Sequence, residues 1–130
     1  MKKNLLVVLT AAALIVSSVA YAAVNGSPVM RKQGKTYIVS TTTLCNTRGF
    51  RGTTPLEVYI KGNKVVKVVA LKNSESPNFF GKVVKGLLPK MAGKNINKAA
   101  SVDGVSGATF SSRAVKANVA AAVRYYQQHK

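Results

Sequence analysis

Acidic residues are scarce in this sequence, which has 3 Asp and Glu against 20 Lys and Arg among its 130 residues. The resulting net charge of +17 favours anionic partners such as nucleic acid, lipid headgroups, phosphorylated cofactors or acidic proteins. Histidine is scarcer still. It occurs once, as His129, next to the C-terminal residue. The sequence therefore offers no Ser-His-Asp or Cys-His set, and hydrolytic chemistry has no support in it.

Cysteine occurs once, as Cys45 in the segment TTTLCNT. A single cysteine excludes an internal disulfide, a pair of thiol metal ligands and the C-x-x-C-H motif of covalent haem attachment. We interpret Cys45 as a small, half-buried strand residue.

The first 22 residues have the order of a secretory signal peptide. Lys2 and Lys3 precede the apolar run LLVVLTAAALIVSSVA, and AYA at 20–22 supplies small residues for a signal peptidase. The apolar run is marginal for crossing a bilayer, which takes about 20 residues, so a retained N-terminal anchor is the alternative to cleavage. We expect an exported protein at the periplasmic or extracytoplasmic face of the cell envelope, where nucleic acid is not an expected partner.

The rest of the chain predicts a single α+β domain. Residues 23–34 are rich in Gly, Pro and polar side chains and predict a flexible leader before a domain at 35–130. Runs of β-branched and aromatic residues predict strands at 35–44, 56–61 and 64–71. Gly62-Asn63 joins the last two as a hairpin, with Val58 and Ile60 on one face, and Val66 and Val68 together on one face of the next strand.

Two helices complete the prediction. Apolar residues at helical spacing indicate one helix within 80–91 and a clearer one from Ser112 onward, with a short strand at 101–102 between them. Ser111 or Ser112 is a candidate N-cap of the second helix. The expected fold is therefore a small antiparallel or mixed sheet packed with two helices.

The segment DGVSGATFSS, residues 103–112, precedes the second helix and contains one of the three acids. Gly104 and Gly107 permit a tight, open loop, and the N-terminus of the following helix favours a phosphate group. Four hydroxyl groups lie in the same loop: Ser106, Thr109, Ser111 and Ser112. Composition and spacing alone are compatible with either a helix-capping turn or an anion site.

The residues DGVSGAT, 103–109, are similar to the flavinylation motif of the FMN-binding domain family, the domain of the NqrC and RnfG subunits of respiratory complexes. That motif runs Asp, two variable positions, Ser or Thr, Gly, Ala and Thr, and every fixed position is met. The resemblance implies that an FAD-dependent transferase attaches FMN to Thr109 through a phosphoester bond. It also implies that Asp103 is the acid needed for modification, and that the loop is shaped by Ser106, Gly107 and Ala108.

The resemblance covers roughly residues 45–128. The hairpin LEVYIKGNKVVKVVAL looks like the family's, and ESPNFFGKV resembles an E-T-P-G-x-G segment that lies near the flavin, which implies site roles for Glu75, Ser76 and Pro77. Ser76 replaces the family's Thr, and Asn78-Phe79-Phe80 replaces the glycine-rich end. Phe79 or Phe80 is a candidate to pack against the flavin ring, with core filling as the alternative.

Taken together, these features imply an exported flavoprotein that carries FMN covalently on Thr109 and transfers electrons, rather than a self-contained enzyme. Its expected partners are the FMN transferase and membrane or extracytoplasmic redox proteins, with possible contact to a membrane surface. Basic side chains that are candidates to hold the phosphate are Lys82, Lys85, Arg113 and Lys116, the alternative being a solvated surface. The alternative interpretation is a basic exported module that binds anionic polymers or lipid headgroups without a cofactor.

Overall fold

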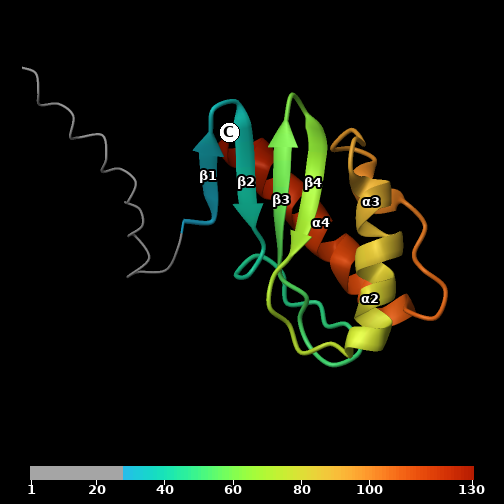
Figure 1. The fold of residues 1–130 in the computed structure, drawn as a ribbon. Coiled ribbons are helices and arrows are strands. Elements are labelled where there is room, and N and C mark those ends of the chain that lie inside the picture. Colours follow the sequence, from blue (N-terminus) through green and yellow to red (C-terminus); the bar gives the residue numbers. More distant parts are fainter. Residues whose placement is uncertain (1–27) are drawn as a thin grey trace, which may run out of the picture.

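The computed structural model describes residues 28–130, so the predicted signal peptide at 1–22 lies outside the described residues. A four-stranded antiparallel sheet has the strand order β1-β2-β3-β4, which is the order along the chain. Figure 1 shows the helix α4 (Thr109–His129) crossing one face of this sheet, with α3 (Leu88–Met91) beside β4 and α2 (Pro77–Gly86) packed against α3 and α4. The predicted α+β fold is confirmed, and its sheet is antiparallel rather than mixed.

The first hairpin consists of β1 (Met30–Gln33) and β2 (Thr36–Ser40). The flexible leader predicted at 23–34 is therefore wrong for its last residues, because β1 pairs with β2 and Met30 packs against the core. The strand predicted at 35–44 ends earlier, because the Leu44 N–H donates to the Thr41 carbonyl in a turn. Cys45 follows that turn and is half-buried, but in a loop rather than the expected strand.

The second hairpin, β3 (Leu56–Lys61) and β4 (Lys64–Ala70), confirms the predicted pair of strands. Gly62 and Asn63 have φ values of 60° and 61°, as a tight hairpin turn requires. The prediction that Val66 and Val68 share one face of the strand is wrong. A bulge between Tyr59 and Ile60 shifts the register, so that Val65 is buried with Val68 while Val66 is exposed.

The helices begin earlier than the sequence predicted. Helix α2 (Pro77–Gly86) starts at a proline, which suits the first helical turn. It is followed by the short α3 (Leu88–Met91) and by a 3₁₀ turn, η4 (Ala99–Ser101), where a short strand was expected. Helix α4 (Thr109–His129) starts three residues before the predicted Ser112.

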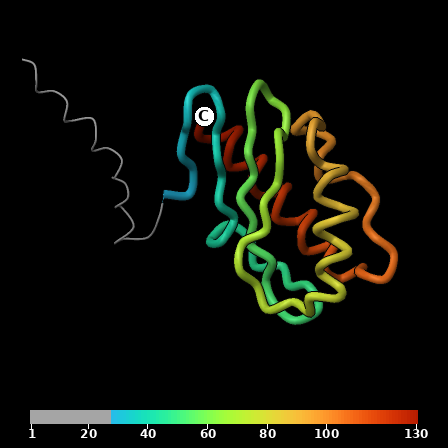
Figure 2. Tube along the Cα trace, viewed as in Figure 1, coloured from blue at the N-terminus to red at the C-terminus, as the bar shows by residue number. Residues whose placement is uncertain are grey.

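The hydrophobic core lies between the sheet and α4; α3 closes it beside β4, and α2 adds Phe80 and Val83 from its place against α3 and α4. The tube in Figure 2 follows α4 back along the sheet, so that its C-terminal end lies close to the β1–β2 hairpin. The stripe predicted on α4 is confirmed, because all five of its members are buried: Val115, Val119, Ala122, Val123 and Tyr126. Tyr126 also packs edge-on against Tyr37 of β2, with ring centroids 5.2 Å apart.

A buried polar cluster fixes α4 against the strand ends. Asn118 is 1% exposed, and its side chain accepts a hydrogen bond from the Thr41 hydroxyl at 2.5 Å. The Asn118 amide nitrogen donates to the Ala114 carbonyl at 2.8 Å and contacts the Thr54 hydroxyl at 3.4 Å. Since Thr41 also accepts the Leu56 N–H at 2.9 Å, the cluster connects α4 to both β2 and β3.

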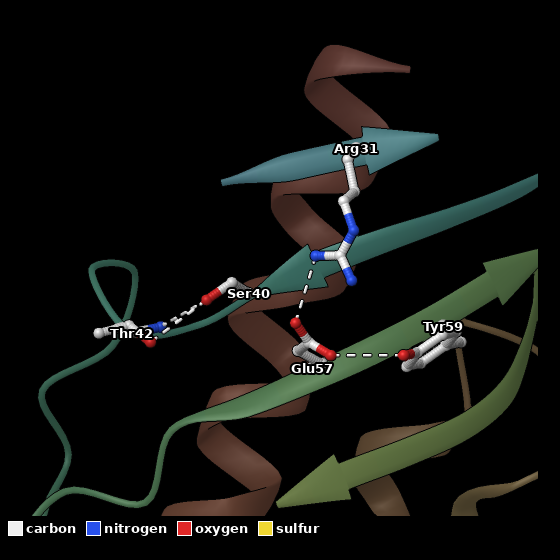
Figure 3. Close-up of polar contacts among 5 residues, drawn as sticks. All are labelled: Arg31, Ser40, Thr42, Glu57 and Tyr59. Atoms are coloured by element: carbon white, nitrogen blue, oxygen red, sulfur yellow. Dashed lines mark hydrogen bonds and ion pairs between the residues drawn. The ribbon is translucent and has the colours of Figure 1, made fainter. Parts of the chain in front are cut away.

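The other face of the sheet has a polar network (Figure 3). Arg31 on β1 reaches across β2 to pair with Glu57 on β3 at 3.2 Å. The Tyr59 hydroxyl donates to the same carboxylate at 3.3 Å, and Lys67 lies 4.5 Å from the centroid of the Tyr59 ring. Ile38 lies between Arg31 and Tyr59 in the strand register and is buried on this face.

Within residues 28–130, no helix is long and apolar enough to span a membrane.

Candidate functional site

The loop before α4 presents Thr109 as the first residue of a 21-residue helix. Gly107 has a φ of 81°, a conformation that side-chained residues rarely adopt, and the chain then enters the helix through the buried Ala108. Ser106 and Thr109 are both exposed. The loop therefore holds the Thr109 side chain at the surface, at the positive end of the helix dipole.

The predicted serine N-cap is wrong. Ala108 occupies the N-cap position, and no side chain caps the helix. Ser111 and Ser112 lie inside the first turn and bond elsewhere: the Ser111 hydroxyl donates to Glu75, and the Ser112 hydroxyl accepts the Val105 N–H at 3.0 Å. The first turn of α4 thus keeps amide groups that a bound anion can use.

An apolar pocket of about 260 Å³ lies on one side of Thr109. Two of its aromatic walls, Phe50 and Phe79, have ring centroids 6.2 Å apart and are 63% and 44% exposed. The pocket is lined by Phe50, Phe79, Gly107, Ala108, Thr109, Phe110 and Ser111. Exposed aromatic rings gathered around a hollow are suited to receiving a flat apolar ring system.

A second pocket, of about 420 Å³ and more polar, also has Thr109 in its lining. Arg113 and Lys116 of α4 contribute its positive charges, and the lining is completed by Gly104, Val105, Ser106, Thr109 and Ser112. Lys82 of α2 is also near the loop, since a Cβ added to Gly107 would lie 3.1 Å from its Nζ. Lys85, also predicted to hold a phosphate, lines neither pocket.

Glu75 connects the segments that build the apolar pocket. Its Oε1 accepts the Phe50 N–H at 2.9 Å and the Ser111 hydroxyl, and its Oε2 accepts the N–H groups of Arg51 and Gly52 at 2.6 and 3.0 Å. Burial would raise the pKa of this carboxyl group. The hydrogen bonds from Ser111 and the three amides outweigh burial and hold the pKa below its ordinary value.

The other residues predicted from the ESPNFFGKV segment take different positions. Ser76 is half-buried before α2, and its carbonyl accepts the Phe80 N–H at 2.8 Å, while Pro77 is the exposed first residue of that helix. Neither lines a pocket around Thr109. Phe79 lines the apolar pocket, whereas Phe80 is buried in the core, so core filling holds for Phe80 and the packing of Phe79 against a flavin ring stays a prediction.

Asp103 is exposed at the start of the loop. In the part of the chain that the structure describes, its carboxylate makes no hydrogen bond or ion pair, and its contact with Lys90 at 3.4 Å uses the backbone carbonyl. The other two acids are engaged, Glu57 with Arg31 and Glu75 with four donors. Asp103 is therefore the one acid of the three whose carboxylate faces solvent without a partner among residues 28–130.

Sequence reasoning missed Phe50 and Phe110 as site residues. Phe110 directly follows the DGVSGAT motif and is 55% exposed, so its position next to Thr109 was a usable signal. Phe50 lies in a glycine-rich loop 59 positions before Thr109, and no local pattern relates the two. Among the described residues, no group of three His, Cys, Asp or Glu side chains is placed to hold a metal ion.

Comparison with known proteins gives one match. A family model for the FMN-binding domain matches residues 49–124, which is more than half of the chain. The matched range begins in the loop that carries Phe50 and contains Glu75, the DGVSGAT motif and most of α4. No curated protein and no solved structure matches the chain.

Proposed function

The chain belongs to the FMN-binding domain family, and from this membership we propose that it carries FMN covalently on Thr109 and acts in electron transfer outside the cytoplasm. The observation that supports this proposal best is the position of Thr109. It lines both the aromatic pocket and the basic pocket. A single attached molecule with a flat ring at one end and a phosphate at the other would reach both.

The two pockets fit the two ends of FMN. A phosphate on the Thr109 hydroxyl would lie at the N-terminus of α4, where backbone amides and the helix dipole favour negative charge. Arg113 and Lys116 would add side-chain charge on the same side. The isoalloxazine ring would enter the apolar pocket between Phe50, Phe79 and Phe110.

Attachment requires an FAD-dependent FMN transferase. The Thr109 oxygen would form a bond to the flavin-side phosphorus of FAD while the bond from that phosphorus to the bridging oxygen breaks, so that AMP leaves and the hydroxyl proton passes to a base. The substrate hydroxyl must reach a second protein, and Thr109 is exposed as this requires. We propose that Asp103 takes part in this attachment step, because its carboxylate is free to contact the transferase or its metal ion.

Bound FMN would supply the redox chemistry, and the protein would attach the flavin and shape its surroundings. The aromatic pocket, at about 260 Å³, is smaller than the roughly 300–1,000 Å³ of typical ligand pockets. A flavin ring would therefore remain partly exposed, which allows close approach by a redox partner. We propose membrane or extracytoplasmic redox proteins as these partners, because residues 1–22 have the pattern of an export signal.

The test is co-expression with an FMN transferase, followed by denaturing electrophoresis and flavin fluorescence. We expect the wild-type protein to show the fluorescence of covalently attached flavin. Thr109→Ala should lose this fluorescence, and Thr109→Ser should keep part of it. Thr43→Ala, which changes an exposed threonine in the turn after β2, is the matched control and should label fully. Labelling of Thr109→Ala would refute the attachment, and an unlabelled wild type that binds anionic vesicles would favour the cofactor-free module.

A further inference from the structure

The walls of the aromatic pocket come from three segments that are far apart in the sequence. Phe50 lies in the loop at 46–55, Phe79 in the first turn of α2, and Phe110 in the first turn of α4. Phe50 and Phe79 are both largely exposed. Because exposed rings bury little apolar surface, the contact between the two rings contributes little to holding the loop in place.

The buried Glu75 side chain joins all three segments. It lies two residues before α2 and is 7% exposed. It binds the backbone of Phe50, Arg51 and Gly52 on one side and the hydroxyl of Ser111, two residues after Thr109, on the other. We propose that Glu75 is a positioning residue: it sets the aromatic pocket by holding the Phe50 loop against the first turns of α2 and α4.

A carboxylate suits this position better than an amide. All four contacts to Glu75 are made by donors, three backbone N–H groups and one hydroxyl. A glutamine would place an NH₂ group against donors at one of its two ends. The loop would then lose at least one charge-assisted bond, and a neighbouring donor would be left buried without an acceptor.

Gly49 provides an independent observation in the same place. A Cβ added at Gly49 would lie 2.7 Å from Glu75 Oε1 and 3.3 Å from the Ser111 Cα. The loop thus approaches the carboxylate and α4 more closely than any side-chained residue would allow. Gly49→Ala should displace the loop without changing the charge of Glu75.

This role of Glu75 rests on the proposed function only for the identity of the molecule that enters the aromatic pocket. The first experiment therefore uses the protein without flavin. Trypsin is added well below the unfolding temperature, and cleavage after Arg48 and Arg51, which lie on either side of Phe50 in its loop, is quantified by mass spectrometry. Loss of hydrogen bonds to a charged group should increase local opening about 10- to 100-fold. We expect this increase in Glu75→Gln and Gly49→Ala.

Glu57→Gln is the matched control, because it removes a carboxylate with an ion pair and a hydroxyl partner on the far face of the sheet. Cleavage at the two arginines should be unchanged in this variant. Unchanged cleavage in Glu75→Gln, or an equal increase at sites throughout the chain, would overturn the proposal.

The second readout is the fluorescence of flavin attached to each variant by the transferase. The pocket walls shield a bound flavin ring from solvent, so iodide should quench the emission of flavin attached to Glu75→Gln more strongly than that of flavin attached to wild type or Glu57→Gln. Equal iodide quenching in all three would also overturn the positioning role. Failure of the wild type to accept flavin would refute the proposed function instead, while the trypsin result would still decide the role of Glu75.

Discussion

Asn118 allows a quantitative test of how α4, and with it Thr109, is held on the sheet. Its side chain is fully buried and makes three hydrogen bonds, to Thr41, Thr54 and the Ala114 carbonyl. Asn118→Ala would leave the Thr41 hydroxyl without an acceptor and open a small cavity. An unsatisfied buried polar group costs about 1–3 kcal/mol, and a cavity adds to that cost.

We therefore expect Asn118→Ala to lower the free energy of unfolding by about 3 kcal/mol. For a domain of about 100 residues this corresponds to a fall in Tm of roughly 12–24 °C. Urea unfolding followed by circular dichroism measures the change, with Thr42→Ala, an exposed residue in the next turn, as the control. A loss below about 1 kcal/mol would refute the reasoning.

A double-mutant cycle makes the test specific to the pair. Thr41→Val removes the partner hydroxyl, so the combined variant should lose less stability than the two single changes added together. The expected coupling between the two sites is about 0.5–3 kcal/mol. Strict additivity would show that the hydrogen bond at 2.5 Å contributes nothing.

Three further predictions concern the site. Asp103→Asn should reduce flavin loading by the transferase with no change in Tm, because the carboxylate has no partner within residues 28–130; normal loading would remove it from the modification step. Phe79→Ala removes one wall of the aromatic pocket and should make the attached flavin easier for iodide to quench, whereas Val84→Ala, equally exposed on α2, should not. Because the folded-state pKa of Glu75 is lowered, its stabilisation is present above the pKa of the unfolded chain and is lost as the pH falls through the lower folded value. Hydrogen exchange of amides 50–52 should therefore accelerate as the pH falls below the ordinary glutamate pKa, and exchange independent of pH, after correction for its intrinsic rate, would contradict this.

Local patterns predicted most of the fold. The hairpin around Gly62-Asn63 and the apolar stripe of α4 follow from periodicities of 2 and 3.6, and both are confirmed. The bulge at Tyr59 and Ile60 has no such signature, because it depends on how two strands fit together. Strand β1 was missed for a related reason: MRKQ has no alternating pattern, and its pairing with β2 makes it a strand.

The candidate site, like the fold, was predicted from the sequence only where its residues are contiguous. The motif at 103–109 is contiguous, so the sequence alone predicts Thr109 as the attachment residue; the family match covers the motif, and the attachment stays a prediction. The Glu75 contacts join residues 23 to 36 positions apart, and the aromatic pocket brings Phe50 beside Phe79 and Phe110, so both depend on tertiary packing. The serine N-cap was mispredicted because Ser111 and Ser112 bond to Glu75 and Val105 instead of to their own helix.

The most direct test of the account is peptide mapping by mass spectrometry of the protein purified from its native cell envelope. We expect one peptide, containing Thr109, whose mass is increased by FMN less one water and whose added mass survives denaturation. Fragmentation should place the modification on the threonine hydroxyl. Flavin released by denaturant, or found on a peptide without Thr109, would contradict the central claim.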